Sequence, residues 1–188
     1  MEQHDFPDAP RLERFRNYLH ILTRLQLGPG SSGHLDASDI VQETLLHAYQ
    51  KRDQFRGEDD AARAKWLRAI LARNVADAMR FQRSKKRDIA REKSLQAELD
   101  CSSDSLGAWL IAEQSTPSEQ AMRHELAVNL ANALARLPQS QREALLLHYW
   151  QGCSLAEIAG RLNRTTDAAG GLLKRGLHRL RELLDAPK

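Results

Sequence analysis

The sequence has few of the residues that hold small secreted or metal-binding proteins together. It contains two cysteines in 188 residues, Cys101 and Cys153, which lie far apart and in different contexts. Neither a disulfide framework nor a zinc site can be assembled from so few ligands. Scarce cysteine is typical of a reducing compartment, so we expect a cytoplasmic protein.

Long hydrophobic runs are also missing. The longest apolar stretches are a few residues, whereas a membrane-spanning helix needs roughly 20. The chain starts with MEQHDFPDAP, which is acidic and does not resemble a secretory leader. The 10 glycines and 6 prolines are too few for a loop-dominated fold. We therefore expect a globular protein that does not insert into a membrane.

Catalytic and metal-binding motifs are absent from the sequence as well. The seven histidines are scattered, and none forms the paired spacing of an HExxH metal site. There is no Walker loop and no GxSxG nucleophile motif. We expect a protein without an active site, a metal or a cofactor. A hydrolase or nuclease would need a cluster of acidic, basic or metal-ligating residues that this sequence lacks.

What the sequence does have is an uneven distribution of charge. The net charge is only +3. Residues 63–93, however, hold 11 basic and 3 acidic residues, and residues 161–181 hold 6 basic and 1 acidic. Between them, residues 94–122 contain five acidic residues and no lysine or arginine. Two basic segments on either side of an acidic one favour a polyanion bound at two places, although solvated helix faces can also be basic.

Apolar residues recur with helical spacing along most of the chain, which predicts an all-α fold. Helices over about 10–27, 36–52 and 61–86 would close a first, three-helix domain within residues 1–91. Capping signals predict four more helices, over about 116–137, 138–149, 154–162 and 165–184, in a second domain of residues 116–188. The polar, acidic residues 92–115 predict a flexible linker, in which Trp109, Leu110 and Ile111 could dock on either domain.

Residues 154–177 have the pattern of a helix-turn-helix. A short helix capped by Ser154 and Glu157 precedes a turn at Asn163, and a longer basic helix follows. Ala159 is small where two helices must cross closely. This pattern predicts DNA binding by the second helix, with its basic residues facing a groove.

Three segments together resemble the extracytoplasmic-function (ECF) sigma factors of the bacterial sigma-70 family. These are DASDIVQETLLHAYQKRDQFRG at 36–57, WLRAILARNVADAMRFQRSKKR at 66–87, and residues 134–184 with LPQSQREALLLHYWQGCSLAEIAGRL. With their helical flanks they cover most of the chain outside the linker. Their order along the chain is more specific than the helix-turn-helix alone.

The resemblance implies an RNA polymerase sigma factor, which supports transcription initiation while the polymerase does the chemistry. Such a factor binds core RNA polymerase at the coiled coil of its largest subunit and at its flap. It recognises the −10 and −35 elements of promoter DNA and promotes strand opening. An anti-sigma factor is a further partner that the family implies. The polymerase-binding residues would be Asp39, Gln42 and Glu43.

For the −10 element, the resemblance implies contacts from the third predicted helix and the residues that follow it. The expected residues are Trp66, Arg73, Asn74, Arg80, Arg83, Lys85, Lys86 and Arg87. The loop 55–65 and Asn74 would capture unstacked bases. Trp66 is either a stacking platform or a core anchor. Asp77 is interpreted as a structural partner of Arg73 or Arg80 at helical spacing.

For the −35 element, the expected DNA-binding residues are Arg164, Thr165, Thr166, Lys174, Arg175 and His178. The sequence departs from the family at Gly170 and Gly171, which each cost about 1 kcal/mol of helix propensity relative to alanine and carry no base-reading group. Either the backbone approaches DNA closely there, or the contacts fall to the residues just named. We hypothesise that recognition relies on phosphates and groove shape more than on direct base readout. The alternative function is a stand-alone helix-turn-helix regulator.

Overall fold

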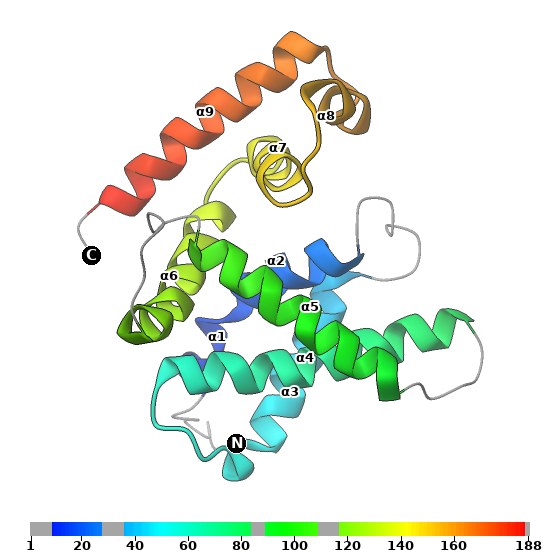
Figure 1. Ribbon diagram of the computed structural model, residues 1–188, viewed down its shortest axis with the longest axis vertical. Helices are drawn as coiled ribbons and strands as arrows, with labels where there is room; N and C mark the ends of the chain where they lie inside the picture. The colour runs from blue at the N-terminus through cyan, green and yellow to red at the C-terminus, as the bar shows by residue number, and fades with distance from the viewer. Residues whose placement is uncertain (1–8, 28–35, 84–88, 109–116, 187–188) are drawn as a thin grey trace, which may run out of the picture. The chain divides into compact units, whose positions relative to one another are not determined.

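A computed structural model describes residues 9–27, 36–83, 89–108 and 117–186 (Figure 1). It divides the chain into two compact units, residues 1–128 and 129–188. Within the described ranges all regular structure is helical, as the sequence predicted. No helix among the described residues is both long enough and apolar enough to cross a membrane.

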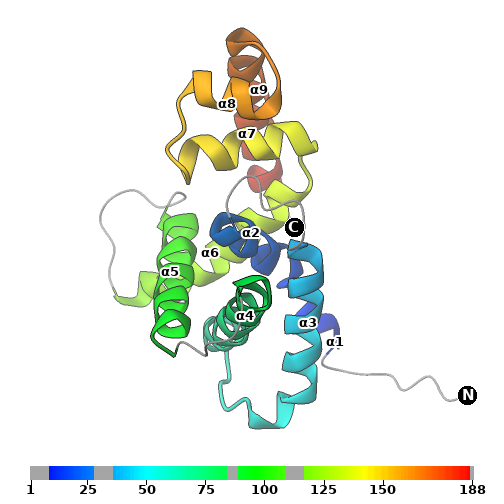
Figure 2. The same ribbon diagram turned by 90° about the vertical axis from the view of Figure 1, so that its right-hand side faces the viewer.

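Before α6, the described residues of the first unit form α-helices joined by short segments. The helices are α1 (Ala9–Glu13), α2 (Arg16–Leu27), α3 (Ala37–Gln50), α4 (Asp60–Arg83) and α5 (Ile89–Ala108). A short 3-10 helix, η1 (Arg52–Gln54), follows α3. The single helix predicted over 10–27 is divided between α1 and α2. Helix α4 lies between α3 and α5 (Figure 2).

The core of this unit forms where α2, α3 and α4 meet. Its largest fully buried side chains include an aromatic pair from the start of the unit, and aliphatic residues fill the space around them. They are Phe15, Tyr18, Leu19, Leu22, Val41, Leu67, Leu71 and Val75. Burying an aliphatic or aromatic side chain of this kind contributes about 1.5–3 kcal/mol, so these helices are held mainly by apolar contact.

Helix α5 occupies residues for which the sequence predicted a linker, so that prediction is wrong for residues 92–108. Leu95, Leu99 and Leu106 are buried, and α5 packs on α2 and α4. These leucines lie four and seven residues apart, on one face of a helix. Ser103 is buried on the same face, and this polar member hid the pattern in the sequence. Trp109, Leu110 and Ile111, the predicted docking residues, lie outside the described residues.

The second unit contains the helices that the sequence predicted. Helix α6 (Pro117–Ala135) crosses the division between units, which falls after Val128 rather than at the predicted Thr116. Helices α7 (Gln139–Tyr149), α8 (Leu155–Leu162) and α9 (Thr166–Asp185) follow. Their ends lie within one or two residues of the predicted ones, which is the usual uncertainty of helix boundaries.

Candidate polymerase and nucleic-acid interfaces

Helix α3 has one buried and one exposed face. Its buried residues are Ala37, Ile40, Val41, Thr44, Leu45 and Ala48. The predicted polymerase-binding residues Asp39, Gln42 and Glu43 are all exposed, and so is Leu46, with 53% of its surface accessible. These four residues follow helical spacing and form one acidic stripe with an apolar residue at its end. Leu46 was not among the predicted residues, although its spacing from Asp39 and Gln42 was visible in the sequence.

Asn74 links α3 to α4 in the interior of the first unit. Only 2% of its surface is exposed. Its Nδ2 donates to Thr44 Oγ1 at 3.0 Å, and its Oδ1 lies 3.1 Å from His47 Nδ1. A buried amide has to be hydrogen-bonded, and these two α3 side chains satisfy it. In this structure the side chain of Asn74 positions α3 against α4, and its capture of an unstacked base stays a prediction.

Arg68 is the second buried polar residue of α4, with 2% of its surface exposed. Its Nε donates to Asp100 Oδ1 at 2.5 Å, and its Nη1 donates to Tyr18 Oη at 2.8 Å. The Tyr18 hydroxyl donates in turn to Ser103 Oγ at 2.7 Å. Burial by itself would lower the pKa of Arg68, but Tyr18 and Asp100 raise it overall. Burial also raises the pKa of Tyr18.

This network joins three segments that are distant in the sequence, namely α2, α4 and α5. Arg68 lies in the basic segment 63–93, but its guanidinium is buried in this network. It is therefore not available to contact DNA. Helical spacing places Arg68 on the same face as Ala64, Leu71 and Ala72, but the partners that make its burial possible come from α2 and α5 and could not be predicted from the sequence.

The outer face of α4 carries the remaining described cations predicted for the −10 element. Arg73 is exposed, and Arg80 is half-buried. Arg80 Nη1 donates to Asp77 Oδ1 at 2.5 Å, which agrees with the interpretation of Asp77 as a structural partner. The side chain of Arg83, together with Lys85, Lys86 and Arg87, lies outside the described residues.

Trp66 packs beside the loop that leads into α4. Its ring centroid lies 5.2 Å from that of Phe55, and the Arg63 guanidinium lies 5.0 Å from the Phe55 centroid. A Cβ added at Gly57 would lie 2.5 Å from the Ala62 Cβ, so position 57 of this loop has no room for a side chain. Trp66 remains half-buried. It is therefore packed on one side by Phe55 and partly open to solvent.

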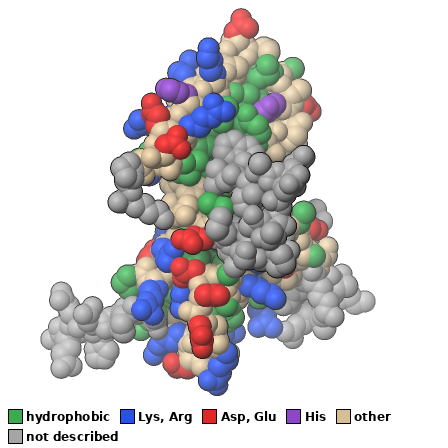
Figure 3. Space-filling view, turned by 60° about the vertical axis from the view of Figure 1, so that its left-hand side comes forward, with side chains coloured by type: hydrophobic (Ala, Val, Ile, Leu, Met, Phe, Trp, Pro, Cys, Tyr) green, Lys and Arg blue, Asp and Glu red, His purple; other side chains and the backbone are tan. Residues whose placement is uncertain are grey.

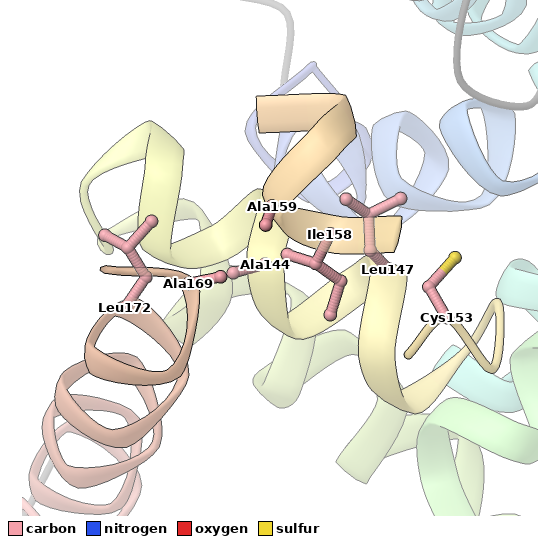
Figure 4. Packing of buried hydrophobic residues seen from close by; sticks show 7 residues of the cluster. All are labelled: Ala144, Leu147, Cys153, Ile158, Ala159, Ala169 and Leu172. Carbon is pink, nitrogen blue, oxygen red and sulfur yellow. The ribbon is translucent and has the colours of Figure 1, made fainter. Parts of the chain in front are cut away.

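The helix-turn-helix is held by a cluster of small and aliphatic side chains from three helices and one turn. Figure 4 shows them converging: Ala144, Leu147, Cys153, Ile158, Ala159, Ala169 and Leu172. The predicted capping box of α8 is present, with the Ser154 amide donating to Glu157 Oε2 at 2.8 Å. Hydrogen bonds from Ser154 lower the pKa of Glu157. Asn163 has φ 51°, the left-handed conformation expected at the turn.

A buried glycine lets α7 and α9 cross closely. A Cβ at Gly176 would lie 3.2 Å from Leu145 Cδ1 and 3.3 Å from Gln141 Cβ. Gly176 lies four residues from Leu172 and from Leu180, both buried on the same face of α9. Gly176 was not among the predicted residues, although this spacing was readable in the sequence.

The opposite face of α9 carries the predicted −35 residues. Thr165 caps the helix by accepting a hydrogen bond from the Ala168 amide at 3.2 Å, which leaves Thr166 exposed beside it. Lys174, Arg175 and His178 are exposed further along the helix. Arg164, in the turn, is exposed and donates to the Asn163 carbonyl at 3.2 Å. Figure 3 shows basic and histidine side chains on the visible surface of this unit, together with acidic ones.

His178 has an acidic neighbour. Its Nε2 lies 3.3 Å from Glu182 Oε1, and Arg179 Nη1 donates to the same carboxylate at 2.7 Å. The arginine hydrogen bond lowers the pKa of Glu182. The anion offsets part of the positive charge at this end of α9. No group of residues that could hold a metal ion occurs among the described residues.

Comparison with known proteins gives matches in both units. Residues 11–85 match the family model for Sigma-70 region 2, and residues 127–180 match that for Sigma-70, region 4. The chain is 30% identical over 150 residues to the ECF RNA polymerase sigma-E factor of Escherichia coli strain K12, covering 80% of this chain and 72% of that protein. It is 30% identical over 152 residues to the RNA polymerase sigma factor CnrH of Cupriavidus metallidurans, covering 80% and 74%. A solved structure of the sigma factor RpoE with the anti-sigma factor NepR from Bartonella quintana matches 97% of this chain and 96% of that one at 23% identity, with a TM-score of 0.34.

Proposed function

The chain belongs to the ECF sigma factors of the sigma-70 family, and from this premise we propose which of its surfaces contact core RNA polymerase and which contact promoter DNA. As an ECF sigma factor it serves transcription initiation. One observation carries the proposal: an exposed acidic stripe on α3 and an exposed basic face on α9 occur in the two units that match sigma regions 2 and 4. In this proposal RNA synthesis itself belongs to the polymerase.

The polymerase-binding surface is the stripe of Asp39, Gln42, Glu43 and Leu46. Three polar or acidic residues beside one exposed leucine suit a partner surface that is basic with an apolar pocket, since desolvated apolar anchors contribute much of the affinity at such interfaces. The coiled coil of the largest polymerase subunit is the partner that the family implies. The hydrogen bonds of Asn74 to α3 support this role because they fix the orientation of the stripe.

The −10 surface is the outer face of α4. Arg73 and Arg80 would contact phosphates, and the half-buried Trp66 would stack against an unpaired base beside Phe55. Arg83, Lys85, Lys86 and Arg87 stay sequence-based predictions for the same surface. Since each neutralised phosphate releases counterions, binding should weaken steeply as salt is raised.

The −35 surface is the exposed face of the helix-turn-helix. Arg164, Thr165 and Thr166 lie at the N-terminal end of α9, the end that enters the major groove in this motif. Lys174, Arg175 and His178 continue the surface toward the C-terminus. An anti-sigma factor that covers these surfaces is a further partner that we propose from the family.

Run-off transcription with core polymerase, with and without the protein, tests the proposal directly. We expect new transcripts with defined start sites only when the protein is added, and mapping those sites would give the promoter elements. A chain that binds duplex DNA tightly and specifically without polymerase, and adds no transcripts, would instead be the stand-alone regulator.

Variants of α3 test the polymerase-binding surface. Glu43→Lys and Leu46→Ser should each weaken binding to core polymerase by about fivefold to tenfold, because they reverse a charge or remove an apolar anchor. Both residues are exposed, so the unfolding midpoint should stay the same. Glu98→Lys, which changes an exposed acid on α5, is the control and should leave binding unchanged. Equal losses from all three variants would contradict the assignment of this stripe.

A further inference from the structure

The two glycines at the start of α9 differ in what surrounds them. A Cβ added at Gly170 would meet no heavy atom within 4 Å. A Cβ added at Gly171 would lie 3.0 Å from Arg175 Nη1, 3.4 Å from Nη2 and 3.5 Å from Cζ. The guanidinium of Arg175 therefore lies against the backbone at position 171, in the space that any other residue's side chain would occupy.

This placement follows from helix geometry. Side chains on a helix lean toward its N-terminus, so residue 175 covers the turn that contains residue 171. Without a Cβ at 171, the guanidinium can lie flat on the helix one turn closer to the N-terminus than its own Cα. Both glycines lower helix propensity relative to alanine, but only at Gly171 does a neighbouring side chain use the space.

The position matters because a guanidinium can form hydrogen bonds with the edge of a base in the DNA groove. The N-terminal part of a recognition helix is the part that reaches base edges, and an arginine there commonly makes two hydrogen bonds to O6 and N7 of guanine. Arginine's planar, rigid fork is suited to such paired contacts, but only when its orientation is held. Among the residues of α9 between Thr166 and Lys174, none is basic, and Arg175 is the cation of α9 whose guanidinium lies against a turn in this part of the helix.

We propose that Gly171 is a positioning residue for Arg175, and that it lets the Arg175 guanidinium lie toward the N-terminal half of α9 to read a guanine in the −35 element. The inference rests on the proposed function of α9 in DNA binding. It gives the glycine pair a specific role at one of its two positions, and it adds one direct base contact to the recognition by phosphates and groove shape hypothesised from the sequence.

A selection experiment with the holoenzyme tests this even though the promoter sequence is not known. Core polymerase carrying the full-length protein selects from a pool of duplex DNA randomised in both promoter elements, and bound sequences are counted. The wild type should select guanine at a defined −35 position. Arg175→Ala should lower that preference by about tenfold, and Gly171→Ala by about threefold, because the new methyl group displaces the guanidinium. Gly170→Ala is the matched control and should keep the preference within about twofold.

The double variant Gly171→Ala/Arg175→Ala separates positioning from other effects. If Gly171 acts through Arg175, Gly171→Ala should have no further effect once Arg175 is absent. Alanine raises helix propensity at both glycine positions, so the unfolding midpoint of Gly171→Ala should equal or exceed that of the wild type. A loss of selection in that variant would then not come from unfolding.

The outcomes distinguish this inference from the proposed function. Equal effects of Gly170→Ala and Gly171→Ala, or an undiminished effect of Gly171→Ala in the Arg175→Ala background, would overturn the positioning role. A uniform loss of affinity for all sequences in Arg175→Ala would overturn the reading of guanine. If alanine at Lys174 and Arg175 together left promoter selection unchanged, the DNA-binding role of α9 itself would fail.

Discussion

The two units of this protein both have apolar cores, but they differ in the contacts that accompany those cores. In the first unit, hydrogen bonds of buried polar side chains join segments far apart in the sequence, as in the contacts of the buried Arg68 with Tyr18 and with the half-buried Asp100. In the helix-turn-helix, the described contacts are local caps and close apolar packing around small residues such as Ala159 and Gly176. The second unit was easier to predict because caps and small residues at helix crossings are recognised from residues that lie close together in the sequence.

The buried Arg68 network should give the largest effect on stability. Arg68→Ala leaves Tyr18 and the half-buried Asp100 without their shared donor, and losing charge-assisted hydrogen bonds of this kind costs about 2–3 kcal/mol. Chemical unfolding of the full chain, followed by circular dichroism, measures the change. Arg80→Ala, which breaks the more exposed pair with Asp77, should cost about 1 kcal/mol or less. Similar losses in the two variants would mean that the network does not hold α5.

Asn74 should show a smaller effect of the same kind. Asn74→Ala removes the hydrogen bonds to Thr44 and His47, and a lost buried hydrogen bond with its unsatisfied partner costs about 1–3 kcal/mol. Unfolding should therefore shift, while the sequence preference at the −10 element is retained at temperatures where the variant is folded. Unchanged stability together with a lost −10 preference would support the base-capturing role instead and weaken the contrast between the units.

The close crossing at Gly176 offers the matching test in the second unit. Gly176→Leu forces a side chain between α7 and α9, where overpacking costs about 1–3 kcal/mol. The same change at Gly160, which is exposed and where an added Cβ would meet no heavy atom within 4 Å, should be neutral or slightly stabilising. The unfolding midpoints of the two variants are compared. If both are neutral, close packing is not what holds α9.

The capping box of α8 should give the smallest effect, and it should depend on pH. The pKa of Glu157 is lowered in the folded protein by its hydrogen bonds with Ser154. Its contribution is therefore fully present above the ordinary glutamate pKa and is lost as pH falls through the lower folded value. Glu157→Gln keeps an acceptor but does not titrate. The wild type should lose thermal stability relative to this variant on acidification, and parallel pH profiles would argue against the capping role.

Much of the fold could be predicted because the relevant signals are local. The ends of α7, α8 and α9 follow from Pro138, the Ser154–Glu157 box and the Asn163 turn, each of which satisfies backbone groups within a few residues. The exposure of the predicted stripe on α3 also follows from the helical spacing of its apolar residues, which places the stripe on the opposite face. Helix α5 was missed because Ser103 occupies a core position, where a polar residue is stable only with the partners that tertiary structure provides.

By itself the sequence determined the helical class, the exposed stripe of α3, the exposed basic residues of α9 and the caps, because each of these depends on spacing along one chain. Tertiary structure alone decided which polar residues lie inside. Arg68, Asn74 and Ser103 look like surface residues in the sequence, and they are buried because complementary groups from other helices replace the hydrogen bonds of water. Arg175 is a different case, because it is exposed and its guanidinium lies against Gly171 through the spacing of one helical turn.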